Sequence, residues 1–335
     1  MHQAKWSRCL FNTLLVISLA ETALLWTASF ATPADADEEI KFSPGSFEGP
    51  KHKGFFLLPN DGQPAKPFGT LTHIDTFGSP TYSADGKWIA FDGIRHGTNF
   101  SSSEAFVMRA DGSELRSLGN GLMPSWSPAG EKLACGRYTP GNSVWVYDVK
   151  TGEKTLVDDT GWGIKWSPDG KYWAYAKRGA LVVKHIKSGT IYEYPFAPEG
   201  SGWTYNFAWS PDGTQICGVV GLENGQEALM VLKLKLDVRK DDAEMLSRDE
   251  KRAGEIQLAI ADKGEMSKDI AWHPTAPRIV LTQYLVPISL NQLFEYNPEV
   301  GSAPWPMPGQ TSTNNYDHCW SPDGKWLLYI GQYAE

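Results

Sequence analysis

The segment WSPDGKWLLY, from Trp320 to Tyr329, places a tight-turn tetrapeptide between two apolar runs. The chain repeats it, with close copies that begin at Tyr82, Trp126, Trp166 and Trp209 and a more divergent copy, WHPTAPRIVL, that begins at Trp272. The leading aromatic residues lie roughly 40 to 50 residues apart, except for one longer interval after Trp209. Such a period is typical of the blades of a β-propeller.

The repeated Ser-Pro-Asp-Gly sequence suits a type I turn that ends in a left-handed residue. Proline sets φ, Ser and Asp hydrogen-bond to local backbone N–H groups, and Gly adopts a positive φ without a Cβ clash. The flanking strands therefore form an antiparallel hairpin. A second hairpin follows most copies, as in AFVMRADGSELRSL from Ala105 and VWVYDVKTGEKTLV from Val144. Two hairpins make one four-stranded blade.

The copy at Trp320 is not followed by a second hairpin, whereas the segment FFLLPNDGQPAKPFGTL, from Phe55, precedes the first copy. We expect strands near residues 55–75 to join those near residues 316–331, so that the N- and C-terminal hairpins together complete the sixth blade. Closure of the ring removes open sheet edges. The sequence thus predicts an all-β, six-bladed β-propeller of four-stranded antiparallel blades over residues 54–331.

The WSPDGKW-type repeat, followed by a strand that ends in an ADG- or KTG-type turn, resembles the TolB-like family of six-bladed propellers over this whole range. The resemblance implies the fold, but propellers serve as scaffolds, ligand binders and enzymes alike. TolB proteins carry an additional α/β domain ahead of the propeller. Here the polar residues 32–53 stand in that place, so we expect a propeller without that domain.

Residues 1–31 have the pattern of a signal peptide. Lys5 and Arg8 precede an apolar run from Leu10, and residues 29–31 or residues 34–36 could be the small-residue cleavage site. The alternative is an uncleaved membrane anchor, in which Glu21 would be costly in lipid. We expect an exported protein, periplasmic or extracellular, that meets a membrane only through this segment if it is retained.

We expect a monomeric protein that does not bind nucleic acid. The formal net charge is −8, whereas a nucleic-acid-binding protein carries a basic stripe. Cys135, Cys217 and Cys319 fall in alternate blades, too far apart for a disulfide.

Two further segments lie outside the repeat pattern. The composition of residues 32–53 predicts a flexible linker. The charged insertion at residues 233–254 predicts a solvated protrusion with a short helix, or alternatively a docking arm for a partner.

One face of the predicted propeller carries the irregular connections, and function usually lies on such loops. The residues three positions before each repeat aromatic should line the mouth of the central channel there. The last three of these are Asn206, Asp269 and Asp317, and His318 follows. They could hold a divalent cation or act as a general acid–base pair, or they could simply cap strand ends. No other cofactor is predicted.

A cationic group is expected on the same face. Arg95, Arg137 and Arg178 follow the second strands of three consecutive blades and could grip a carboxylate or an acidic glycan. The alternative is ordinary surface charge. The loop aromatics Trp162, Trp203 and Tyr284 could stack on sugar rings or peptide side chains.

No nucleophile elbow, zinc-protease motif, Cys-x-x-Cys pair or phosphate loop occurs in the chain. We therefore expect a binding or scaffold module that recognises an envelope protein or cell-envelope glycan through its loop face and channel mouth. The alternative is a lyase or hydrolase that acts on an acidic polysaccharide, with the channel-mouth carboxylates and His318 as its site.

Overall fold

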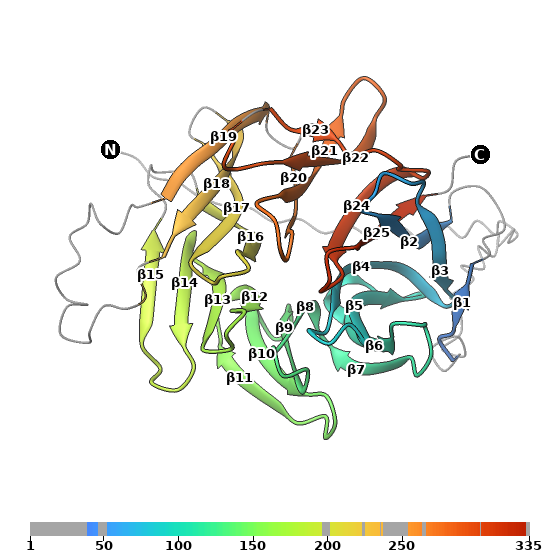
Figure 1. The fold of residues 1–335 in the computed structure, drawn as a ribbon. Coiled ribbons are helices and arrows are strands. Elements are labelled where there is room, and N and C mark those ends of the chain that lie inside the picture. The colour runs from blue at the N-terminus through green and yellow to red at the C-terminus, as the bar shows by residue number, and fades with distance from the viewer. Residues whose placement is uncertain are drawn as a thin grey trace, which may run out of the picture.

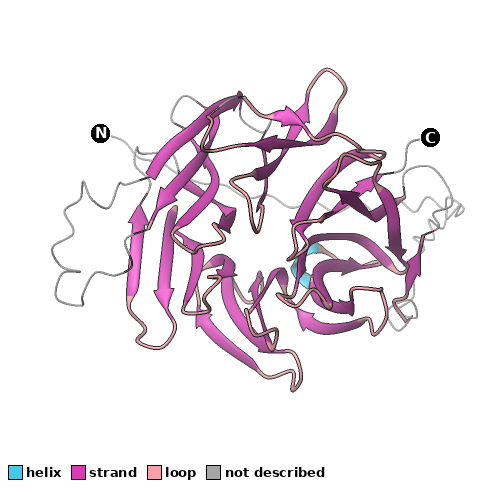
Figure 2. Ribbon diagram, viewed as in Figure 1, coloured by secondary structure: helices cyan, strands magenta, loops and turns pink. Residues whose placement is uncertain are grey.

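The computed structural model describes residues 39–45, 52–195, 202–222, 225–234, 236, 254–262, 266–301 and 303–332. Six antiparallel sheets follow one another around a common axis (Figure 1). Within the described ranges the only helical element is a short 3-10 turn, Phe100–Ser102 (Figure 2). The protein is an all-β, six-bladed propeller, as the repeat predicts.

The strands run outward from the axis in chain order within blades one to five. Blade one contains β4 (Ile74–Tyr82), β5 (Trp88–Arg95), β6 (Glu104–Arg109) and β7 (Arg116–Asn120), and blade two contains β8 (Leu122–Trp126), β9 (Lys132–Arg137), β10 (Ser143–Asp148) and β11 (Lys154–Asp158). Blade three contains β12 (Trp162–Trp166), β13 (Tyr172–Lys177), β14 (Ala180–His185) and β15 (Ile191–Pro195), and blade four contains β16 (Gly202–Trp209), β17 (Gln215–Gly221), β18 (Gln226–Lys233) and β19 (Gly254–Asp262). Blade five contains β20 (Met266–Trp272), β21 (Ile279–Leu285), β22 (Leu290–Tyr296) and β23 (Trp305–Pro306).

Blade six is built from both ends of the chain. The inner strands β24 (Thr313–Trp320) and β25 (Trp326–Gln332) are continued by β2 (Lys53–Pro59) and β3 (Lys66–Leu71). β25 pairs with β2 along its whole length, so the red and blue strands of Figure 1 lie side by side. The predicted closure is confirmed.

A fifth strand, β1 (Phe42–Pro44), pairs with β3 at the outer edge of blade six. It lies inside residues 32–53, so this part of the predicted flexible linker is ordered structure. The Phe42 ring packs on the ring of Phe68 at 5.0 Å and covers Gly69 of blade six and Gly112 of blade one. The absence of a Cβ at both glycines leaves the room that this ring occupies. β1 thus covers the outer seam between the first and last blades.

The Ser-Pro-Asp-Gly turns form as their chemistry predicts. In blade three, Ser167 Oγ donates to Asp169 Oδ1 at 2.7 Å and accepts from the backbone N–H of Tyr172 at 2.9 Å. The glycine of this turn, Gly170, has φ of +72°. The equivalent serines Ser83, Ser127, Ser210 and Ser321 are likewise buried and accept from the corresponding N–H group.

The core consists of apolar layers between successive blades. In the seam that closes the ring, Phe55 of β2 packs on Phe77 and Phe91 of blade one, with ring centroids 4.7 and 5.5 Å apart. The repeat turns add contacts across other seams, because the prolines Pro128 and Pro168 lie against the turn glycines Gly170 and Gly213 of the next blade. Blade-to-blade packing therefore uses the same residues that shape each hairpin.

Cys135, Cys217 and Cys319 are free. No helix among the described residues is long and apolar enough to cross a membrane. The predicted signal peptide at residues 1–31 and nearly all of the insertion at residues 233–254 lie outside the described residues.

Candidate functional site

Each innermost strand departs from regular pairing at the position three residues before the repeat aromatic. The strand register shifts across this position in β4, β8, β12, β16, β20 and β24. The residues there include Ser79, Met123 and Asp317, with φ of 51°, 49° and 46°. β-Bulges bend a strand and re-aim its side chains, and they are common beside functional sites. Six repeated irregularities thus surround the axis at one level.

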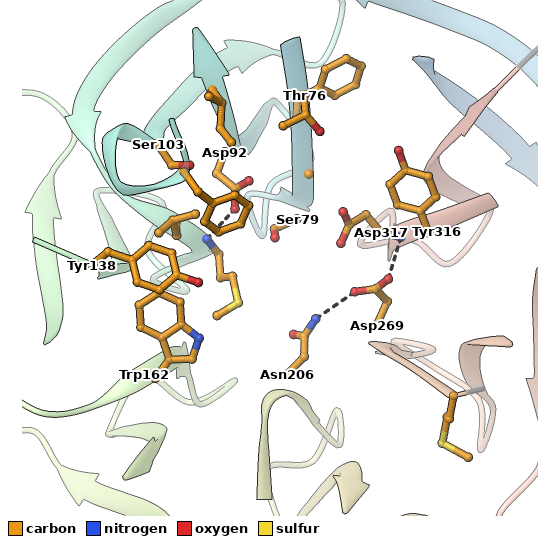
Figure 3. Close-up of a pocket in the computed structure, with 17 residues that line it drawn as sticks. Thr76, Ser79, Asp92, Ser103, Tyr138, Trp162, Asn206, Asp269, Tyr316 and Asp317 are labelled. Carbon is orange, nitrogen blue, oxygen red and sulfur yellow. Dashed lines mark hydrogen bonds between the residues drawn. The ribbon is translucent and has the colours of Figure 1, made fainter. Parts of the chain in front are cut away.

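Five of these six positions line a cavity of about 400 Å³ on the propeller axis, and Trp162, next to the sixth position, adds blade three to the lining. We call it the axial cavity. Its remaining lining comes from other residues of the innermost strands, from β5, and from loops of blades one and two. It therefore lies at the face that carries the irregular connections. Figure 3 shows Tyr138 and Trp162 on one side of it, and Asn206, Asp269 and Asp317 on the other.

Hydrogen bonds orient the polar wall. The Asn206 side-chain amide donates to Asp269 Oδ1 at 3.1 Å, and the backbone N–H of Asp317 donates to Asp269 Oδ2 at 3.2 Å (Figure 3). Asp92 Oδ2 accepts from the backbone N–H of Met123 at 2.7 Å. The Asp269 carboxylate thus links blades four, five and six, and the Asp92 carboxylate links blades one and two.

Gly78 allows two of these carboxylates to approach the backbone of β4. A Cβ added to this residue would lie 2.6 Å from Asp317 Oδ2 and 3.4 Å from Asp92 Oδ1. A side chain at residue 78 would therefore displace the Asp317 carboxylate. Residue 78 is therefore a glycine because the Asp317 carboxylate needs the space, and not because a turn needs a positive φ.

The carboxylates lie deep in the protein, and only part of each is open to the cavity. Burial, and then the neighbouring charges of Asp269 and Asp92, raise the pKa of Asp317 well above its ordinary value. Burial also raises the pKa of Asp92. The nearby ammonium of Lys165 offsets part of this cost, although burial lowers its own pKa. Three carboxylates thus share the attraction of one lysine.

The opposite wall is aromatic. The Tyr138 ring lies 4.3 Å from the Trp162 ring and 5.4 Å from the Phe100 ring, measured between centroids. Phe100 is 56% exposed and Tyr138 is 37% exposed, so both present ring surface at the cavity edge. Tyr316 lines the polar side, and its buried hydroxyl has no hydrogen-bond partner within the described structure.

Three of the predicted channel-mouth residues, Asn206, Asp269 and Asp317, line the axial cavity together. His318 does not line it. Its Nε2 donates to the backbone carbonyl of Val280 at 3.0 Å, and its Nδ1 lies 3.4 Å from the Thr282 hydroxyl. Neighbouring residues of a strand point to opposite sides, so His318 lies between blades five and six while Asp317 faces the axis. Burial lowers its pKa, which favours the neutral imidazole.

Two members of the predicted cationic rim, Arg95 and Arg137, have partners within their own blades. Arg95 donates from Nε and Nη2 to the two carboxylate oxygens of Glu104, at 2.7 and 3.2 Å. Arg137 donates to the Tyr147 hydroxyl at 2.6 Å, and its guanidinium lies 4.3 Å from the Trp145 ring centroid. Both side chains fold back on their own blades. Arg178 is exposed in the β13–β14 turn, and none of the three arginines lines the axial cavity.

Among the loop aromatics, Trp162 lines the cavity as expected. Trp203 does not, because it is 6% exposed and packs in the core between blades three and four. Tyr284 is likewise absent from the lining.

The sequence analysis missed Asp92. It lies in β5, and the corresponding positions of the other second strands carry Gly136, Ala176, Val219, Thr282 and Ile330. A single carboxylate in a column of small or apolar residues is a detectable signal, because burying a charge is costly unless something compensates it. Among the described residues, no group of three or more His, Cys, Asp or Glu side chains is arranged to hold a metal ion.

Comparison with solved structures agrees with this architecture. A protein described as TolB from Agrobacterium tumefaciens superimposes with a TM-score of 0.59 at 15% identity, over 86% of this chain and 100% of the other. TolB from Acinetobacter baumannii gives 0.54 at 13% identity, over 84% of this chain and 63% of the other. The fold is TolB-like.

An oligogalacturonate lyase in complex with manganese has the same fold, with a TM-score of 0.51 at 14% identity, over 88% of this chain and 91% of the lyase. No protein-family model matches the sequence, and a search of curated proteins found no match. At these identities the similarity shows the TolB-like fold and not a ligand. The structural neighbours with this fold include an enzyme.

Proposed function

We propose that this TolB-like propeller is an exported binding module that takes part of an envelope protein or glycan into the axial cavity. One observation carries the proposal. A cavity to which all six blades contribute opposes exposed aromatic rings to oriented carboxylate and amide groups. Ligand sites typically combine apolar walls with a few convergent polar groups in this way.

The same geometry disfavours the alternative of an enzyme that acts on an acidic polysaccharide. Such a substrate would meet the carboxylates of Asp92, Asp269 and Asp317, and like charges repel at short range in a poorly solvated site. Arg95 and Arg137, which could have neutralised it, are engaged by Glu104 and Tyr147. His318, the proposed catalytic imidazole, is bonded to blade five. Binding of a neutral or cationic group is the better match.

Export, a periplasmic or extracellular location and a monomeric state belong to the same proposal. Their support is the N-terminal sequence pattern and the closure of the ring by β2 and β25, which leaves no unpaired strand at that seam. Cell fractionation with an antibody against the propeller would test the location.

The binding proposal is tested by capture from an envelope extract. The chain from residue 32 would be immobilised as wild type, as Trp162→Ala and as Asp269→Asn, with Lys150→Ala as a control. Lys150 is exposed in the β10–β11 turn, on the opposite face. We expect the wild type and the control to retain the same protein or glycan, and both cavity variants to lose it while their melting temperatures stay close to wild type.

Two results would contradict the proposal. Retention of the partner by both cavity variants would place binding elsewhere on the molecule. Recovery of a captured glycan in shortened form would indicate the enzyme instead.

A further inference from the structure

The axial cavity is lined by three carboxylates and, among the described residues, by no basic side chain. Asp92, Asp269 and Asp317 line it, and Lys165 is the cation whose attraction acts on all three. Buried charges are costly unless they are paired. In the free protein, the raised pKa of Asp317 favours retention of a proton on this carboxyl, which reduces this cost. A ligand that carries one positive charge would reduce it further.

The aromatic wall favours the same charge. Phe100, Tyr138 and Trp162 form one continuous row of rings on the cavity lining. An organic cation is attracted to the face of such rings when it lies within about 6 Å of their centroids. Exposed rings are costly to leave in water, so this wall is better explained by a ligand group than by packing alone.

The structure assigns the axial cavity to an organic ammonium group, a primary or quaternary alkylammonium held between the aromatic row and the three carboxylates. This assignment rests on the proposed function and specifies the chemistry of its ligand. The cavity of about 400 Å³ is large enough for such a group and the chain that carries it.

Other ligand classes fit less well. A neutral sugar could stack on Trp162 and donate to Asp269, but it would leave the charge excess uncompensated. An anionic group would add to the repulsion among Asp92, Asp269 and Asp317. Among the described residues, these carboxylates do not form a metal-binding group.

The assignment also predicts a proton exchange. Asp317 faces Asp269 of β20, Asp92 of β5 and Lys165 of β12, and His318 follows it on β24. An ammonium beside Asp317 favours its ionised form, so binding releases a proton where Asp317 is protonated in the free protein. Affinity should therefore rise with pH.

The experiment uses three small probes on the full chain: choline, n-butylammonium and 3,3-dimethyl-1-butanol, the uncharged isostere of choline. Calorimetric titration at low salt should show that choline or butylammonium binds at least about 10-fold more tightly than the isostere. The two cations distinguish a quaternary from a primary ammonium. Titration in buffers of different ionisation enthalpy should show proton release.

Variants locate the site. We expect Trp162→Ala and Asp317→Asn each to weaken the preferred cation about 5- to 10-fold, and Asp317→Asn to remove most of the pH dependence. Asp92→Asn provides a second test of the polar wall if Asp317→Asn folds poorly. Lys150→Ala should bind as the wild type does.

Binding of both choline and butylammonium no tighter than that of the isostere would overturn the ammonium assignment and leave the proposed function standing. So would the absence of binding by either cation up to about 10 mM, if Trp162→Ala still abolishes partner capture. If the capture also survives Trp162→Ala, the proposed function fails as well.

Discussion

At the scale of the residue, the buried serine of each repeat turn holds its hairpin together. Ser167 is 1% exposed, donates to Asp169 and accepts from the Tyr172 N–H. The divergent fifth copy replaces this serine with His273, whose Nδ1 accepts from the Thr275 N–H at 3.2 Å. Different side chains thus supply an acceptor at the same corner, because the turn leaves backbone N–H groups that need one.

We expect Ser167→Ala to lower the free energy of unfolding by about 1–3 kcal/mol, because it leaves a buried N–H without its acceptor. Ser113→Ala is the matched control, since Ser113 makes the same kind of bond to Asp111 in an exposed turn. That control should change stability by less than about 0.5 kcal/mol. Denaturant unfolding measures both, and equal effects would show that burial of the serine does not matter.

Asp317 should make the stability of the protein depend on pH. Its folded pKa is raised above the unfolded value, so its protonated form favours the folded state. That stability is present below the ordinary Asp pKa and is lost as pH rises through the folded pKa. Asp317→Asn, which cannot ionise, should therefore gain stability relative to wild type as pH rises from about 4 to about 8. A difference that stays constant over this range would contradict the account.

At the scale of the element, the innermost strands decide what faces the axis. The irregularity of β24 at Asp317 directs its backbone N–H to Asp269 and its carboxylate to Gly78, while His318 lies between blades five and six. The same irregularity in all six inner strands makes a lined cavity from positions far apart in the chain. The cavity is therefore a property of strand geometry as much as of residue type.

The closing strand β2 is the element on which the seam between blades six and one depends. Phe55→Ala should lower the free energy of unfolding by about 3–5 kcal/mol, because this fully buried ring packs on Phe77 and Phe91 of blade one. Phe42→Ala in β1 is the comparison, since Phe42 is only half-buried, and it should cost clearly less. Thermal and denaturant unfolding would measure both, and similar losses would mean that β2 is not the main closing contact.

At the scale of the whole molecule, closure protects strand edges. A chain that begins at residue 73 would lack β1, β2 and β3 and expose the β25 edge, with Leu327 and Leu328 losing apolar cover. We expect it to form oligomers on size-exclusion chromatography with light scattering. A chain that begins at residue 52 lacks only β1 and should elute and melt close to the full chain. A monomeric, cooperatively melting form of the shorter chain would show that closure is dispensable.

The sequence by itself determined the repeat, the turns, the number of blades and the closure of the ring. These features depend on local backbone preferences, such as the positive φ of Gly170, and on the pattern of apolar residues. Both can be recognised from residues that are close together in the sequence. It also placed Asn206, Asp269 and Asp317 at the axis, because a repeat transfers one blade's geometry to the others.

Only the tertiary structure decided how the site is composed. Asp92 joins Asp317 across the seam between blades one and six, and Tyr138 meets Trp162 between blades two and three. His318 and Arg95 do not line the cavity, and they hydrogen-bond instead to Val280 and Glu104 on other strands. A side chain's partner depends on which distant segments pack beside it and on the small rotation that a bulge introduces. Neither the packing partner nor this rotation can be predicted from the residue spacing within one strand.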